Sequence, residues 1–259
     1  MTHQVKTGMP TPAFSRICGF AGVGFALLIV LGNVVMVPAG LPVTGTETDE
    51  VITFFGGSTG ADAVALASVL TPLTWILATL FGAGAVAVLW PSERERGEAW
   101  SLAGLAGLVL QNGAFAAVIA LRLALASTAG RDDGATAGLW ALHDALFTLN
   151  GTFLALALLG LTLAGLRSGL VRRWHGGLGL LSAALLFTSA TLTPLVTDHA
   201  GPLGLLGLTG WLLWVVWLVV YGISLARNPL AARTPGPAGF RNGDSYLAPV
   251  RTADHHPAP

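Results

Sequence analysis

The chain has very few charged residues for its length. Of its 259 residues, only 10% are Asp, Glu, Lys or Arg, whereas 53% are hydrophobic. Soluble domains average about 25% charged residues, so a soluble fold of this composition would have too few polar side chains to cover its surface. The composition therefore predicts a membrane protein whose main partner is the lipid bilayer.

Three further absences narrow the class. Cys18 is the single cysteine, which excludes an intramolecular disulfide and a cysteine-based metal cluster. Acidic and basic residues balance at 13 each, so no electrostatic argument favours nucleic-acid binding. The sequence also has no Walker motif, GxSxG, HExxH or CxxC. We therefore expect neither a nucleic-acid partner nor a cofactor.

Six apolar segments are each long enough to cross about 30 Å of hydrocarbon as a helix. The predicted spans are 17–37, 63–89, 101–125, 139–166, 176–196 and 203–225. Together they predict an all-α six-helix transmembrane domain over residues 17–226, between a cytoplasmic segment 1–16 and a disordered cytoplasmic tail 227–259. The first apolar segment is longer than the core of a signal peptide, which favours a retained helix over a cleaved leader.

Glycine is abundant, at 34 residues. Small residues on helix faces allow backbones to approach closely inside a membrane, and Ala103 and Gly107 predict one such contact on the third span. The same Gly/Ala-rich faces leave open a homo- or hetero-oligomer.

Basic residues fall almost entirely on one side of the six-span arrangement. With both termini inside, 11 of the 13 Lys and Arg residues are cytoplasmic, while Arg131 is outside and Arg122 lies within a span. Cytoplasmic loops of membrane proteins typically show this bias. It predicts a multi-pass protein of the cell membrane with both termini in the cytoplasm.

The long loop between the first two spans is acidic and contains one apolar segment, Asp49–Phe55. This segment predicts a short helix on the membrane surface. We expect Thr46 to cap its start and Gly56 with Gly57 to end it.

The fourth span and the loop after it resemble a large group of uncharacterised actinobacterial multi-pass membrane proteins. The matching segments are Leu142–Gly151 (LHDALFTLNG) and Arg167–Gly176 (RSGxxRRWHG), and the first span ends in a similar Leu31–Asn33 (LGN). The similarity in pattern extends from Ile17 to Ala226. The resemblance implies a helical membrane bundle of this size. It implies no activity, so no functional residue is carried over.

Ionisable residues gather at the predicted outer surface. His143 and Asp144 begin the fourth span, Asp198 and His199 lie in the last outer loop, and Arg122 ends the third span. Two histidines and two carboxylates can bind zinc or another divalent ion, and they can equally relay protons. The spacing matches no known metal signature, however. In the plainer alternative, Asp144 pairs with Arg122 across two antiparallel helices and the loop residues have no special role.

Amide side chains lie near the middle of the predicted membrane. Gln111, Asn112 and Asn150 either join helices by hydrogen bonds or form the polar lining of a substrate cavity. Gln111 and Arg122 are 11 residues apart and therefore share a helix face. The residues Arg122, Asp144, Asn112 and Asn150 are thus candidates for a structural or proton-relay role.

Two classes of function remain open. The first is a non-enzymatic bundle that acts in transport, sensing or partner binding. The second is an intramembrane enzyme, or a metal- or proton-dependent protein, that uses the outer His/Asp cluster. Enzymes of this kind usually place several His and carboxylate side chains inside the bundle, and here only His143 and Asp144 meet that condition. The sequence therefore favours the first class.

Overall fold

The computed structural model describes residues 12–192 and 202–227. Within these ranges the chain forms helices and no strand. The helices are α1 (Pro12–Met36), α2 (Thr48–Gly56), α3 (Ser58–Arg96), α4 (Trp100–Thr128), α5 (Asp133–Ser168), α6 (Arg173–Leu192) and α7 (Pro202–Ala226). All except α2 are long and apolar enough to cross a membrane, which confirms the predicted all-α fold with six candidate spans.

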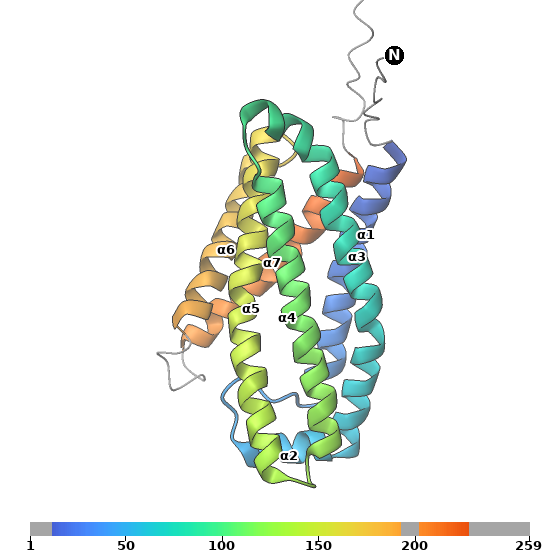
Figure 1. Ribbon diagram of the computed structural model, residues 1–259, viewed down its shortest axis with the longest axis vertical. Helices are drawn as coiled ribbons and strands as arrows, with labels where there is room; N and C mark the ends of the chain where they lie inside the picture. The colour runs from blue at the N-terminus through green and yellow to red at the C-terminus, as the bar shows by residue number, and fades with distance from the viewer. Residues whose placement is uncertain (1–11, 193–201, 228–259) are drawn as a thin grey trace, which may run out of the picture.

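The six long helices form a closed ring. Each packs against the next along the chain, from α1 to α3, α4, α5, α6 and α7, and α7 then packs against α1. Figure 1 shows α2 lying across one end of the bundle, where it contacts α3, α4 and α5. The start of α1, the end of α7 and the α3–α4 and α5–α6 loops lie at the opposite end. The basic loops therefore share one end of the bundle, as the orientation argument requires.

Glycines set the closest helix contacts. A Cβ at Gly107 of α4 would meet the backbone of Ala157 on α5, and a Cβ at Gly160 would meet the backbone of Gly104. Gly107 thus makes the predicted close contact. The second small residue on the same face of α4 is Gly104, whereas the predicted Ala103 is half-exposed. These glycines are used inside the bundle, and the oligomer stays a prediction.

Local capping residues define the ends of the long helices. The Asp132 carboxylate accepts a hydrogen bond from the Ala135 N–H at 2.9 Å and caps the start of α5. Gly97 ends α3 and Gly169 ends α5, with φ of 67° and 78° in the left-handed region. Glycine adopts this region without steric cost, so each helix stops there and the chain turns.

The short helix expected in the first long loop is present as α2 and ends at Gly56. The predicted Thr46 cap is wrong. The residue before the helix is Glu47, which makes no side-chain capping bond. The Thr46 hydroxyl instead donates to the Val43 carbonyl at 2.7 Å, because a hydroxyl in a turn easily bonds to the backbone three residues earlier.

Candidate functional site

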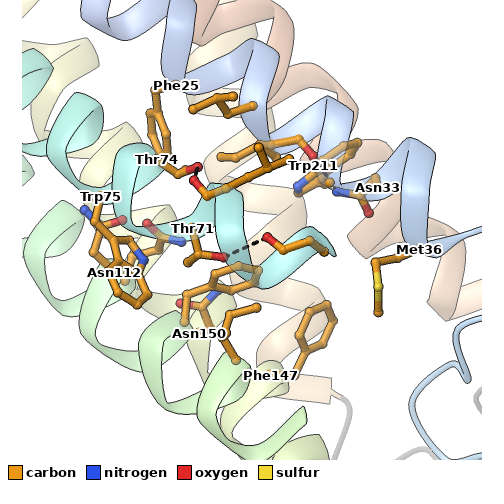
Figure 2. Close-up of a pocket in the computed structure, with 18 of the residues that line it drawn as sticks. Phe25, Asn33, Met36, Thr71, Thr74, Trp75, Asn112, Phe147, Asn150 and Trp211 are labelled. Carbon is orange, nitrogen blue, oxygen red and sulfur yellow. Dashed lines mark hydrogen bonds between the residues drawn. The ribbon is translucent and has the colours of Figure 1, made fainter. Parts of the chain in front are cut away.

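A cavity of about 190 Å³ lies inside the ring, in the half of the bundle nearer α2. Five long helices, all except α6, contribute to its lining. On α1 the lining runs from Phe25 to Met36 and on α4 from Gln111 to Arg122. The end residues of each stretch are 11 positions apart, which corresponds to about 16 Å along a helix axis. The cavity is therefore elongated along the bundle. Figure 2 shows its side chains converging from several helices.

Three residues that line this cavity each carry a buried polar atom with no hydrogen-bond partner in the described part of the chain. These atoms are the donor Nε1 of Trp75 and the acceptors Oε1 of Gln111 and Oδ1 of Asn150. Gln111 is 5% exposed and Asn150 is 9% exposed, so neither reaches bulk solvent. Buried polar atoms in native proteins are nearly always paired, and an unpaired one costs about 1–3 kcal/mol. Three such atoms on one cavity indicate a place where a bound molecule or water supplies the partners.

Three other polar side chains of the lining, Asn33, Thr71 and Thr74, donate hydrogen bonds within their own helices. The hydroxyls of Thr71 and Thr74 donate to carbonyls one turn earlier, at 3.1 and 2.9 Å, and the Asn33 amide does the same at 2.9 Å. Figure 2 includes the bond made by Thr71. The two threonine hydroxyls therefore have only acceptor lone pairs left, whereas the Asn33 amide keeps one N–H donor and its oxygen. The predicted interhelical hydrogen bonds of the mid-membrane amides are absent among the described residues.

A chain of hydrogen bonds joins the cavity to the end of the bundle. The Arg122 Nε–H donates to Nε2 of His143 at 3.1 Å, and Nδ1 of His143 lies 3.2 Å from Oδ1 of Asp144. The other Asp144 oxygen accepts the Gly45 N–H at 2.8 Å. The prediction of a direct ion pair between Arg122 and Asp144 is therefore wrong, because His143 lies between the two charges.

These contacts define the protonation state of His143. Arginine has no acceptor, so Nε2 of His143 must be unprotonated to accept from Arg122. Its Nδ1 then carries the proton and donates it to the Asp144 carboxylate. The neutral ring is held between Trp140 and Phe147, with centroid distances of 4.6 and 6.0 Å and interplanar angles of 12° and 7°. Both nitrogens are used, so a metal at His143 would have to replace one of these bonds.

The structure thus brings together most of the residues that the sequence singled out. Arg122, Asn112 and Asn150 line the cavity, whereas His143 and Asp144 continue the hydrogen-bond chain away from it. Asp198 and His199 lie outside the described residues. Among the residues that are described, no group of three His, Cys, Asp or Glu side chains is placed to hold a metal. The outer metal site remains a prediction.

The comparison with protein families matches residues 20–222, more than three quarters of the chain, to the Domain of unknown function (DUF4386). The chain belongs to this family. No curated protein and no solved structure matches it. The family has no assigned function, which agrees with the uncharacterised character of the group that the fourth span resembles.

In this family member, α2 and the loop before it contact the bundle close to His143. Trp140 donates its Nε1–H to the Thr46 carbonyl at 3.2 Å, and its ring packs against Phe55 of α2 at 6.2 Å between centroids. Val51 and Phe55 are fully buried in the same cluster. Trp140 therefore contacts α2, the loop before α2, and His143, the central residue of the hydrogen-bond chain.

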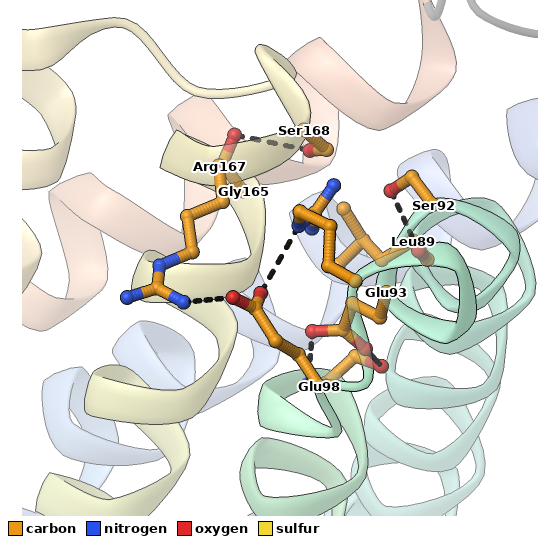
Figure 3. Close-up of polar contacts among 9 residues, drawn as sticks. Leu89, Ser92, Glu93, Glu98, Gly165, Arg167 and Ser168 are labelled. Carbon is orange, nitrogen blue, oxygen red and sulfur yellow. Dashed lines mark hydrogen bonds and ion pairs between the residues drawn. The ribbon is translucent and has the colours of Figure 1, made fainter.

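The opposite end contains a polar cluster that the sequence analysis did not single out (Figure 3). Glu93, at the end of α3, is fully buried and accepts hydrogen bonds from the N–H and hydroxyl of Ser101, so it caps the start of α4. Glu98 pairs with Arg96 and Arg167 and joins the two basic loops. The charged segment from Ser92 to Glu98 predicts only a solvated turn, and nothing in its pattern distinguishes the buried carboxylate.

His175 was also missed. It lies in the first turn of α6, is 1% exposed and donates from Nε2 to the Trp217 carbonyl at 3.0 Å. Its position beside the basic loop suggests an interfacial residue, whereas the ring in fact packs against Trp217 and Tyr221. His175 is a satisfied core histidine and does not reach the cavity.

Proposed function

We propose that this protein is a non-enzymatic membrane protein that binds a small molecule in the cavity inside the ring, as a transporter or sensor does. The observation that carries the proposal is the set of three unpaired, buried polar atoms on Trp75, Gln111 and Asn150. All three residues line one cavity, and the rest of its lining is mostly apolar. Ligand sites typically combine apolar walls with a few polar groups that orient the molecule.

The composition of the lining favours binding over catalysis. Its described residues include no Ser, Cys, His, Asp or Glu, so nucleophile–base pairs of the usual types do not face the cavity. The two threonine hydroxyls, on Thr71 and Thr74, donate to their own helix. Arg122 is the one titratable group of the lining, and a guanidinium stays protonated and cannot act as a base.

Glycine positions provide a direct test of binding. A Cβ at Gly32 would meet no atom within 4 Å, and Gly32 lines the cavity, so Gly32→Leu should fill part of it. Gly113 is equally open but does not line the cavity, so Gly113→Leu is the matched control. The probe is 8-bromooctan-1-ol, whose bromine quenches tryptophan fluorescence on contact, and Trp211 and Trp214 are part of the lining.

In a neutral detergent, the wild type and Gly113→Leu should show saturable quenching by the probe. Gly32→Leu should show only the linear quenching that comes from probe dissolved in the micelle. Saturable quenching that is unchanged in Gly32→Leu would show that the probe binds elsewhere, and the proposal would fail.

We further propose a cell-membrane location with both termini in the cytoplasm, and an actinobacterial source. The basic loops at one end of the bundle support the orientation. In a Cys18→Ala background, Arg131→Cys should react with a membrane-impermeant maleimide in intact cells. Arg94→Cys should react only after the cells are permeabilised. The reverse pattern would overturn the orientation. Both arginines are exposed.

A further inference from the structure

The described lining of the cavity has one charged side chain, Arg122, which is 8% exposed. A buried cation within a helical membrane bundle is costly unless a partner stabilises it. Its one polar partner in the described part of the chain is Nε2 of His143, which is uncharged. No carboxylate lies on the described cavity wall. The wall therefore presents a positive charge without a contacting anion.

The hydrogen bond to His143 determines which part of Arg122 remains available. It uses the Nε–H, while the two terminal nitrogens have no partner among the described residues. A guanidinium binds a carboxylate best through two parallel N–H groups. Asp144 cannot fill this role, because its oxygens accept from His143 and Gly45 on the far side of the imidazole. The geometry leaves a free donor pair for an external carboxylate.

The shape of the cavity indicates the rest of the ligand. Arg122 is at one end of the α4 lining, and the lining of α1 reaches Phe25 at the other end. There the Phe25 and Trp214 rings meet edge-on, with centroids 5.8 Å apart. A molecule that reaches from the cation to this aromatic end must be narrow, because about 190 Å³ is distributed over a length of about 16 Å.

We infer that the cavity binds a linear monocarboxylate with an apolar chain. Its carboxylate lies on Arg122 and its chain runs between the helices toward Phe25 and Trp214. The volume limits the bound part to a short or medium chain, since a 150 Å³ cavity in another protein already holds benzene. This inference rests on the proposed function and names the class of ligand for the same cavity.

The test compares two probes that differ only in the head group. These are 8-bromooctanoate and 8-bromooctan-1-ol, measured by tryptophan quenching at pH 8 with the full chain in neutral detergent. The wild type should bind the acid at least about tenfold more tightly than the alcohol, because a charge-assisted bidentate contact is worth that much. Arg122→Gln should bind both probes with the affinity that the wild type has for the alcohol. Arg122→Lys should keep a reduced preference for the acid.

Each outcome decides a different statement. Equal affinities of the wild type for acid and alcohol would overturn the carboxylate inference and leave the proposed cavity binding intact. A preference for the acid that survives in Arg122→Gln would place the carboxylate elsewhere and would also overturn it. No saturable binding of either probe would overturn both proposals. If Arg122→Gln does not fold, the wild-type ratio and Arg122→Lys decide the question.

Discussion

Replacement of His143 by Phe should destabilise the bundle strongly even though the ring packing is retained. Phenylalanine keeps an aromatic ring between Trp140 and Phe147, so the stacking contacts survive. It removes the acceptor for Arg122 and the donor for Asp144. The effect of the substitution therefore reports on the hydrogen bonds rather than on the packing.

The expected magnitude follows from the two charged partners. A hydrogen bond to a charged group contributes about 1.5–3 kcal/mol. Breaking a buried charged contact typically costs about 3–5 kcal/mol, because a charge is left unpaired. Arg122 loses its one described partner, whereas Asp144 keeps the Gly45 N–H and has a side chain that is 18% exposed. We therefore expect His143→Phe to lower the free energy of unfolding by about 3 kcal/mol.

The measurement is thermal unfolding in detergent, followed by circular dichroism or by dye binding. For a chain of this size, a loss of 3 kcal/mol corresponds to a fall in Tm of roughly 6–12 °C. The control is Leu142→Phe, which introduces the same side chain at the preceding position, where the residue is 51% exposed. A Tm for His143→Phe that matches the control would refute the hydrogen-bond chain.

A double-mutant cycle then tests whether His143 couples the two charges. Arg122→Leu leaves Asp144 with His143 and the Gly45 N–H, Asp144→Leu leaves Arg122 with His143 alone, and the double variant removes both charges. Groups that belong to one hydrogen-bond network show coupling energies of 0.5–3 kcal/mol, whereas independent sites add to within about 0.3–0.5 kcal/mol. Additive effects of the two substitutions would mean that the imidazole does not connect Arg122 to Asp144.

Two further predictions concern packing and capping. Gly107→Ala should lower the free energy of unfolding by about 1–3 kcal/mol, because the new Cβ would meet the backbone of α5. Gly113→Ala on the same helix should be neutral or stabilising, since its Cβ would meet no atom within 4 Å. Equal Tm values for the two variants would contradict the close α4–α5 crossing. Glu93→Gln should lower stability by about 1–2 kcal/mol through loss of a charge-assisted cap, while the exposed Glu95→Gln should leave Tm unchanged; equal effects would contradict the capping role.

The helices were predictable because membrane thickness and composition determine them. A span must satisfy its backbone hydrogen bonds internally and cover the hydrocarbon, so long apolar segments leave few alternatives to helices. The short α2 was predictable from an apolar segment that two glycines end. The closure of the ring by α7 against α1 was not, because it depends on the facing surfaces of Gly19 and Gly222, and neither glycine differs in sequence from many others.

The site was predictable as a set of residues and not as an arrangement. Helical periodicity placed Gln111 and Arg122 on one face, and both line the cavity. The partner of Arg122 depended on a rotation that periodicity does not resolve. His143 and Asp144 are adjacent and differ by about 100° around the helix, and the structure turns the histidine inward, with 3% exposure. Charge complementarity alone predicted Asp144 as the partner of Arg122. That prediction did not consider that an imidazole can form hydrogen bonds through both of its nitrogens.

Asp144 connects the residues beside the cavity to the loop before α2. One of its oxygens holds the tautomer of His143 that accepts from Arg122, and the other holds the backbone of Gly45 in the loop before α2. Trp140 repeats the connection, since it stacks on His143 and bonds to the Thr46 carbonyl. The loop is therefore attached to two residues that position His143, the hydrogen-bond partner of Arg122. A change that displaces the loop should therefore also disturb the hydrogen bonds that align Arg122, the residue proposed to bind a carboxylate.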